Sequence, residues 1–327
     1  MTAKTRYFVL VAAGILTAGL TTGLVASYLG APVALSNQAG PDDLAFVPPD
    51  AAVVAFANVQ EVMASQLRQR LQRLQPDGRE RDDFEAKTGV NVERDIDSVV
   101  AALMPEAGDH DGRPLVLARG RFDVVRIEGV AREHGGEVSD YQGVRIVSHA
   151  GDGKTMSLGF LEPGVVAMGS LESVRAAVDA KRTGRNVLSN TEMMRLVSEL
   201  DPSNAWAVGR FDAVARAQGL PGELQQRVPT LSWFSAAGHL NGGLSGTLKA
   251  EAKDDEAARN LRDMLRGVVA MVRLQAEGKP ELRTLVDSLQ LGGEGKTVAI
   301  GFSVPAETFD LLEDMHGQRA RRRGNAR

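Results

Sequence analysis

Cysteine is absent from this 327-residue chain. Its absence excludes disulfides, thiolate catalysis, iron–sulfur clusters, cysteine–zinc sites and a lipid-modified N-terminal cysteine. The chain also lacks a large excess of positive or negative charge, since its formal net charge is only −4. No global feature therefore indicates nucleic acid as a partner. With 43% hydrophobic and 24% charged residues, the composition is that of a folded globular protein rather than a disordered chain.

The usual catalytic and phosphate-binding motifs are missing as well. The chain has no HExxH and no GxSxG, and the nearest approach, Gly243–Thr247, ends in threonine. Gly-Lys-Thr occurs at 153–155 and again at 295–297. A phosphate loop needs a glycine five places before that Gly-Lys pair and a helix after it, but Ser148 and Gln290 stand there and strands are expected to follow. Both segments are therefore interpreted as hairpin turns.

Metal-ligand spacing is equally poor. Asp109-His110-Asp111-Gly112 is only a fragment of a calcium loop, without the remaining ligands, and is interpreted as a solvated loop. The other histidines are scattered and are expected at the surface or at helix ends: His134, His149, His239 and His316. The carboxylates lie mostly at predicted helix caps and faces. We therefore predict no cofactor and no metal site, leave the catalytic residues unknown, and consider an enzyme less favoured but open.

One long uncharged segment stands out near the N-terminus. Lys4 and Arg6 precede an apolar stretch from Phe8 to Gly30. As a helix it would be about 33 Å long, which matches the hydrocarbon core of a bilayer and exceeds the apolar region of a signal peptide. Because the cations come first, the N-terminus should stay in the cytoplasm. Residues 1–30 are thus predicted to be a signal-anchor transmembrane helix in the cell membrane, with an extracytoplasmic body.

Two alternatives remain for this leader. Ala34-Leu35-Ser36 is an acceptable cleavage site, which would give a secreted or periplasmic protein, and a buried soluble helix is the other alternative. Gly19 and Gly23 have the GxxxG spacing that lets helix backbones approach, which suggests a homodimer through the membrane helix. The competing explanation is that small residues are simply common in such helices.

After a predicted linker at 31–50, the body alternates short apolar strands with helical patterns. Strands are expected at 52–59, 114–122, within 137–170, at 204–211, 232–252 and 297–304. Helices are expected at 61–74, 93–104, 124–135, 171–184, near 190–200, at 254–278 and after 305. Asn241-Gly242 predicts a hairpin, and Trp206 and Trp233 on strands are expected to pack in the core.

Two phrases recur along the chain. GDGKTMSLGF at 151–160 matches GEGKTVAIGF at 293–302, and RGRFDVV at 119–125 echoes VGRFDAV at 208–214. We therefore predict an α+β fold with mixed or antiparallel sheets, helices packed on one face, and two related halves. The expected boundaries are 51–188 and 189–315, followed by a basic disordered tail at 316–327.

Three segments carry a resemblance to a known group. At 52–74, 204–214 and 236–265 the chain resembles membrane-anchored bacterial envelope proteins whose shared domain has no assigned function. The common pattern is a strand, an acidic helix start and a long helix. The resemblance implies an exported α+β body, and it implies no activity and no site residues.

The preferred hypothesis is a non-enzymatic binding or scaffolding module of the bacterial envelope, whose partner is an envelope protein, lipid or cell-wall component. One alternative is an extracytoplasmic hydrolase with a site assembled from distant residues, and another is a self-associating envelope assembly subunit. A pocket with clustered carboxylates or a partnered histidine would favour the enzyme, whereas a broad apolar groove would favour binding.

Overall fold

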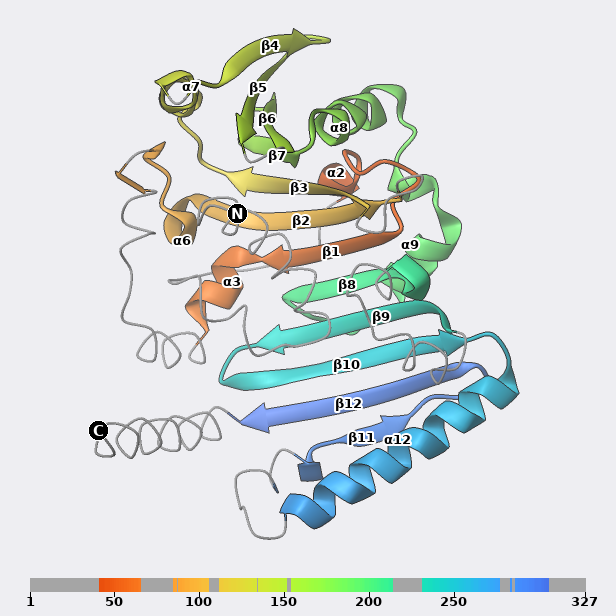
Figure 1. The fold of residues 1–327 in the computed structure, drawn as a ribbon. Helices are drawn as coiled ribbons and strands as arrows, with labels where there is room; N and C mark the ends of the chain where they lie inside the picture. The colour runs from red at the N-terminus through yellow and green to blue at the C-terminus, as the bar shows by residue number, and fades with distance from the viewer. Residues whose placement is uncertain are drawn as a thin grey trace, which may run out of the picture.

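The computed structural model describes residues 41–65, 85–86, 88–105, 112–133, 135–151, 154–213, 231–276, 283 and 286–305. They form an α+β fold around one twelve-stranded antiparallel sheet (Figure 1). The predicted membrane helix, the linker before residue 41, the helix beyond residue 65 and the basic tail all lie outside these residues. Within the described ranges, no helix has the length and apolarity needed to cross a bilayer.

The strands are β1 (Val53–Asn58), β2 (Ile96–Met104), β3 (Arg113–Gly120), β4 (Glu137–Tyr141), β5 (Val144–Gly151), β6 (Lys154–Glu162), β7 (Val165–Gly169), β8 (Ala205–Arg210), β9 (Leu231–Leu240), β10 (Gly243–Ala252), β11 (Gln290–Gly292) and β12 (Thr297–Pro305). The helices are α2 (Pro41–Leu44), α3 (Val59–Ala64), α6 (Val92–Asp95), α7 (Val124–Glu133), α8 (Leu171–Thr183), the 3₁₀ turn η1 (Val187–Ser189), α9 (Thr191–Ser198) and α12 (Asp255–Ala276).

The sheet runs in the order β11-β12-β10-β9-β8-β1-β2-β3-β7-β6-β5-β4, and every pairing is antiparallel. Its centre is the β1–β8 pair, where Phe56 lies opposite Trp206. On either side of that pair the chain forms a meander, β1-β2-β3 or β8-β9-β10, then a helix, α7 or α12. A later strand then returns to the outer strand of the meander, β7 to β3 and β12 to β10. The expected antiparallel pairing is confirmed, and no parallel pair is present among the described strands.

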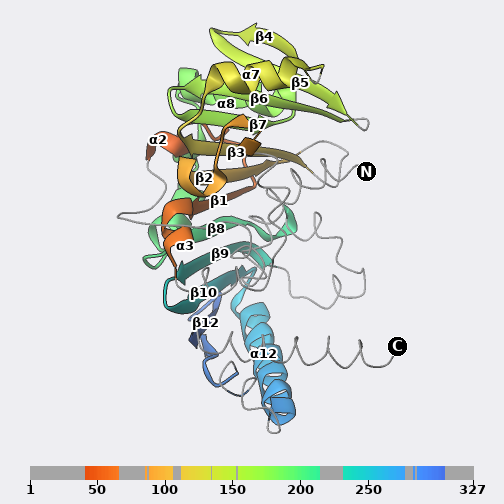
Figure 2. The same ribbon diagram turned by 90° about the vertical axis from the view of Figure 1, so that its left-hand side faces the viewer.

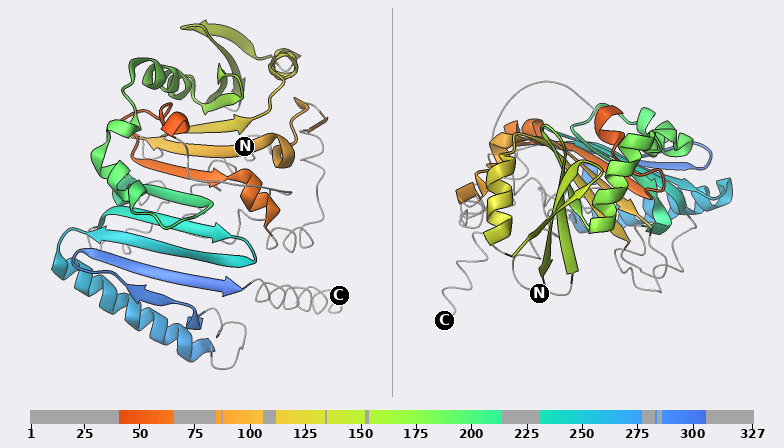
Figure 3. Two further views of the ribbon diagram at one scale, coloured as in Figure 1. Left: turned by 180° about the vertical axis from the view of Figure 1, so that it is seen from behind. Right: turned by 90° about the horizontal axis from the view of Figure 1, so that it is seen from above.

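Helices cover both faces of the sheet, so the prediction that they pack on one face was wrong. The face that carries Leu115 and Ala167 packs against α8 and α9, and we call it the α8 face. The opposite face, called the α12 face, packs against α3 through Met63 and against α12 through Leu261. Figure 3, seen from above, also shows α7 and α8 on opposite sides of the outer strands. The central strands are apolar on both sides, so burying only one side would leave the other in water.

The segment 93–104 was predicted to be a helix and is mostly a strand. Helix α6 lasts for four residues, and β2 begins at Ile96. From Val99 to Met104 every side chain of β2 is buried, because both of its faces are covered. The apolar–polar alternation that marks a half-buried strand is therefore lost, and a continuous apolar run does not distinguish a strand from a helix.

The segment 41–50, assigned to the linker from its prolines, belongs to the packed body. Leu44, Phe46 and Val47 are buried in the core under the α8 face. The carboxylate of Asp43 accepts a hydrogen bond from Arg119 Nε on β3 at 2.7 Å, which fixes α2 to the sheet. The burial of Leu44, Phe46 and Val47 thus holds this short segment in the fold, although its composition resembles that of a linker.

Helix caps and a hairpin turn that the sequence predicted are confirmed. The Ser170 hydroxyl accepts a hydrogen bond from the Ser173 amide and caps α8, which ends at Gly184 in the left-handed conformation. Asp123 likewise accepts from the amide of Arg126 at the start of α7. The strands β9 and β10 form the predicted hairpin around Asn241. These elements depend on short-range chemistry, which the sequence displays directly.

Candidate functional site

The α8 face differs between the two ends of the sheet. Over β3, β5, β6 and β7 it is apolar and covered by α8. Beyond α9, over the His239 end of β9, the Ser245 end of β10, and β11 and β12, none of the described helices covers it. By the strand register, the side chains on that uncovered part are mostly polar or small: Ala237, His239, Ser245, Thr247, Gly301, Ser303 and Gln290. An antiparallel sheet tolerates such a face because its backbone groups are paired and polar side chains meet the water.

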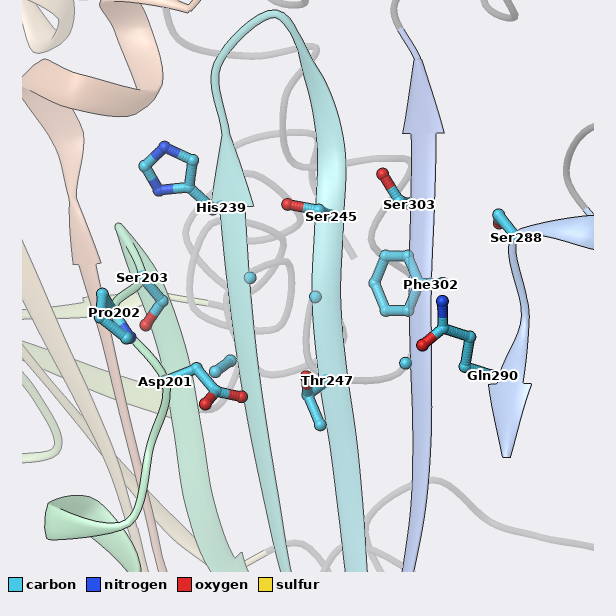
Figure 4. Close-up of a pocket in the computed structure, with 14 residues that line it drawn as sticks. Asp201, Pro202, Ser203, His239, Ser245, Thr247, Ser288, Gln290, Phe302 and Ser303 are labelled. Atoms are coloured by element: carbon cyan, nitrogen blue, oxygen red, sulfur yellow. The ribbon is translucent and has the colours of Figure 1, made fainter. Parts of the chain in front are cut away.

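A shallow trough of about 330 Å³ occupies this uncovered part. Its hydroxyl groups come from Ser245 and Thr247 on β10 and from Ser303 on β12, with His239 beside them on β9 (Figure 4). The loop before β8 forms one side, and β11 with Gln290 forms the other. The loop lies in line with β8, so the four strand spacings from β8 to β11 place these sides about 19 Å apart. We call this cavity the polar trough.

Two glycines shape the floor of the polar trough. Gly301 faces the trough, and the nearest atom to an added Cβ there would be Cβ of Gln290 at 3.8 Å, so the position is open. Gly246 sits on β10 between the two trough hydroxyls, and an added Cβ would come within 2.8 Å of the Phe302 ring and 2.6 Å of the Ala237 carbonyl oxygen. Phe302 packs on the α12 face and closes the sheet below the trough. Glycine at 246 is thus required by the close approach of that ring.

The loop side of the polar trough is held by the buried side chain of Asn204. Its Nδ2 donates to the Leu240 carbonyl at 2.8 Å, and its Oδ1 accepts from the Leu240 amide at 3.0 Å. The amide group therefore pairs with the end of β9 as another strand would. Because Asp201, Pro202 and Ser203 precede it directly, this contact positions the loop that lines the trough.

The boundary between the covered and uncovered parts is an ion cluster at Arg195 on α9. Its guanidinium lies 2.6 Å from Glu192, 2.8 Å from Glu199 and 2.7 Å from Glu251 on β10. Hydrogen bonds to Glu192 and then Glu251 raise the pKa of Arg195, and the Arg195 hydrogen bond lowers the pKa of Glu192. Lys249 also donates to the Glu199 carbonyl oxygen at 3.1 Å, near the end of α9. The cluster fastens α9 across β10, beside the trough.

The side chains that line the polar trough are mainly hydrogen-bonding groups. Its hydroxyls, the Gln290 amide and the His239 ring can donate and accept, while Asp201 supplies the one carboxylate among its lining residues. Among the described residues, His239 has no side-chain hydrogen bond to a carboxylate, and no group of three or more histidines or acids could hold a metal ion. The trough is neither the clustered-carboxylate pocket nor the apolar groove that the sequence hypotheses distinguished.

A rejected sequence motif supplies part of the trough. Gly243–Thr247 lies at the start of β10, in a strand rather than at a strand-to-helix turn, yet Ser245 and Thr247 are two of the trough hydroxyls. The two Gly-Lys-Thr segments do lead into strands, β6 and β12, as predicted. Sequence reasoning found no site here because serine and threonine on a strand are common, and only the register of β9, β10 and β12 brings them together.

The remaining candidates are placed as follows. Trp206 is buried against Phe56, with ring centroids 5.9 Å apart, so its predicted core role is confirmed. Trp233 is partly buried against the same core and lines a small neighbouring hollow beside α9. His149 is exposed on β5, and His239 is exposed on β9. The other three histidines, His110, His134 and His316, and the glycines Gly19 and Gly23 lie outside the described residues.

Comparison with known proteins assigns the chain to no family. No protein-family model and no curated protein matches the sequence. Among solved structures, TP0453 in its crystal form III is similar in fold, with a TM-score of 0.46 and 11% sequence identity. That match covers 83% of this chain and 97% of TP0453. The resemblance to membrane-anchored envelope proteins noted in the sequence therefore stays an expectation.

Proposed function

We propose that this protein is a non-catalytic binding module of the bacterial envelope, anchored in the membrane by residues 1–30, which binds a neutral, hydrogen-bonding ligand such as a cell-wall glycan strand in the polar trough. The observation that carries the proposal is the uncovered part of the α8 face. There the sheet presents hydroxyl and amide groups in a cavity instead of a helix-covered core.

The lining groups decide the class of ligand. Serine and threonine hydroxyls with a glutamine amide match the donors and acceptors of a sugar or an amide chain. A strongly anionic ligand is disfavoured because none of the described residues that line the trough is a lysine or arginine and Asp201 is negative. A trough about 19 Å wide accepts a segment of a polymer better than an enclosed small molecule.

The membrane anchor and the two related halves are part of the same proposal. The sequence supports the anchor through its uncharged run behind Lys4 and Arg6. The order of elements on the two sides of the β1–β8 pair supports a duplication in which β12 corresponds to β7, whereas the recurring phrase aligns β12 with β6. Protease treatment of intact spheroplasts tests the orientation, since residues 50–327 should be digested, and complete protection would reject it.

Ligand binding is tested with the full chain in detergent and purified cell-wall fragments of defined length, by isothermal titration calorimetry. Thr247→Val removes one trough hydroxyl at nearly constant volume, and Ser303→Ala removes a second. We expect each to weaken binding by roughly three- to tenfold, the value of one hydrogen bond. Ser139→Ala on β4 removes the hydroxyl of an exposed serine far from the trough and is the control. Equal affinity in all four proteins would reject the trough as the site.

The hydrolase alternative is tested in the same samples. A binding module leaves the fragments intact, so chromatography of the titration mixtures should show no shorter products. Product formation that is lost in His239→Gln and Asp201→Asn would favour the enzyme instead, because these are the ionisable side chains that line the trough.

A further inference from the structure

The loop side of the polar trough carries a negative charge without a counterion among the described residues. Asp201 is exposed in the loop before β8, and it is the one acidic side chain among the residues that line the trough. Figure 4 shows its carboxylate on the side of the loop that faces Thr247, within the trough. In the described ranges of the chain, the Asp201 carboxylate has neither a hydrogen-bond nor an ion-pair partner. A ligand group that enters here therefore meets an unpaired carboxylate.

The cations of the neighbouring Arg195 cluster are engaged with other groups. Arg195 lies within 2.8 Å of three carboxylates, those of Glu192, Glu199 and Glu251. Lys249 donates to the Glu199 carbonyl oxygen at 3.1 Å, near the end of α9. The cluster thus contains three carboxylates and two cations, so it has no excess positive charge with which to neutralise the loop.

Two further arginines in the same half of the chain also have acidic partners. Arg210 Nη2 lies 3.2 Å from Asp212, and Arg283 Nε lies 3.8 Å from Asp287. Neither arginine lines the trough. The charge of the trough is therefore set by Asp201, and a cavity whose walls carry one sign of charge concentrates ligands of the other sign.

The groups beside Asp201 suit an ammonium group better than other cations. An ionised carboxylate only accepts hydrogen bonds, and the Ser203 and Thr247 hydroxyls accept as well as donate. The three donors of an ammonium can therefore be shared between carboxylate and hydroxyl oxygens. A guanidinium is stabilised by stacking on an aromatic face, but the Phe302 ring packs on the α12 face. A calcium ion takes about six to eight oxygen ligands, and only one carboxylate is found among the described lining residues.

We propose that the polymer bound in the trough carries a primary ammonium group that pairs with Asp201, on a chain that is otherwise neutral. This inference rests on the proposed function and refines its ligand. The serine and threonine hydroxyls and Gln290 bind the neutral part, and Asp201 selects the positively charged group. Two cell-wall components have this chemistry, an amino sugar without its acetyl group and a wall peptide with a free side-chain amine. Asp201 is then the residue that distinguishes amine-bearing from fully acetylated polymers.

Acetylation of the ligand gives a direct test, because it removes the charge of an amine and leaves the length of the polymer unchanged. The probes are peptide-free glycan oligomers with deacetylated amino sugars, and acetylated glycan fragments whose peptides keep a free side-chain amine. Each is titrated calorimetrically into the full chain in detergent at pH 7, before and after treatment with acetic anhydride. We expect the amine form of one probe to bind roughly three- to tenfold more tightly, as for a partly exposed ion pair. The probe that shows the difference identifies the source of the amine.

Two variants locate the effect. In Asp201→Asn the ratio of the two dissociation constants should fall to about one, and in the wild type it should fall as salt is raised, since salt screens an exposed pair. Glu133→Gln on α7 is the control, because it also removes one exposed negative charge and should leave the ratio unchanged. Figures 1 and 2 show α7 near β4, at the far end of the sheet from β9, β10 and β12.

The outcomes separate this inference from the proposed function. If the amine and acetylated forms bind equally and Thr247→Val still weakens both, the trough is the site and the inference is wrong. If Asp201→Asn keeps the preference for the amine, the amine is bound elsewhere and the assignment to Asp201 is wrong. If no form of either probe binds, the proposed function fails, and this inference fails with it.

Discussion

Gly159 on β6 and Gly301 on β12 occupy the same place in the two recurring phrases and face the same side of the sheet. Their surroundings differ. A Cβ added at Gly159 would lie 2.6 Å from Cγ1 of Val174 on α8, whereas at Gly301 the nearest atom is 3.8 Å away. The phenylalanine that follows each glycine packs on the opposite, α12 face. One local sequence thus builds a strand under a helix in one half and the floor of a cavity in the other.

The difference shows that the presence of a covering helix, and not the strand sequence alone, decides whether a sheet face becomes core or the floor of a cavity. Where α8 lies on the sheet, the outer meander strand β3 places Leu115 and Leu117 beneath it. The corresponding strand β10 places Ser245 and Thr247 toward water. Apolar side chains are stabilised only where another layer excludes water, so strand composition follows the presence of the helix.

The largest expected effect comes from a substitution beneath α8, in the covered part of the α8 face. Leu115→Ala removes a fully buried side chain beneath α8 and should lower the free energy of unfolding by about 2–5 kcal/mol, because it loses apolar burial and leaves a cavity. Denaturant titration measures this change. Thr247→Ala on β10 is the matched change in the uncovered half and should stay within about 0.5 kcal/mol. Similar losses in both variants would show that the trough is part of a packed core.

The next largest effect comes from removing the Asn204 contact that positions the loop beside the uncovered part of the α8 face. Asn204→Ala leaves the Leu240 amide and carbonyl without their buried partner, so we expect a loss of about 1–3 kcal/mol in unfolding free energy. Ligand affinity should fall as well, since the 201–203 loop loses its attachment. The exposed Asn241→Ala in the neighbouring turn is the control. A variant with normal stability and normal affinity would mean that Asn204 does not position the loop.

A pair of alanine substitutions sharpens the comparison directly. Gly159→Ala should cost about 1–3 kcal/mol, because the added methyl group pushes against the stiff Val174 and displaces α8. Gly301→Ala should be neutral or slightly stabilising, since there is room and the unfolded chain loses entropy. Thermal unfolding of both variants is the measurement. A loss at Gly301 as large as at Gly159 would contradict an open floor.

The smallest effect concerns the boundary between the two regions. The hydrogen bond with Arg195 lowers the pKa of Glu192 in the folded protein. The stabilisation by this pair is therefore complete above the pKa of a glutamate in the unfolded chain, about 4.3. This stabilisation is lost as the pH falls through the lower pKa that Glu192 has in the folded protein. Arg195→Met should therefore destabilise the protein at pH 7, and the gap to the wild type should narrow toward pH 3. The measurement is denaturant titration across this range, with Arg266→Met on α12 as control. A gap that does not change with pH would exclude this linkage.

Short-range features were predictable from the sequence. The cap at Ser170, the turn at Asn241-Gly242 and the amphipathic pattern of α12 each depend on a few neighbouring residues. The errors came where distant segments intervene. β2 was interpreted as a helix because neighbours on both faces removed its alternation, and 41–50 was interpreted as a linker because its burial depends on contacts such as the one with Arg119.

The site was beyond sequence reasoning for the same reason. Ser245, Ser303 and His239 carry no motif, and they meet because β10 pairs with β9 on one side and β12 on the other. By itself the sequence determined the uncharged run from Phe8 to Gly30, the absence of thiol chemistry, the α+β class and most elements, since these follow from composition and local periodicity. Only the tertiary structure decided which part of a sheet face is covered, because that depends on long-range packing of helices that local patterns do not encode.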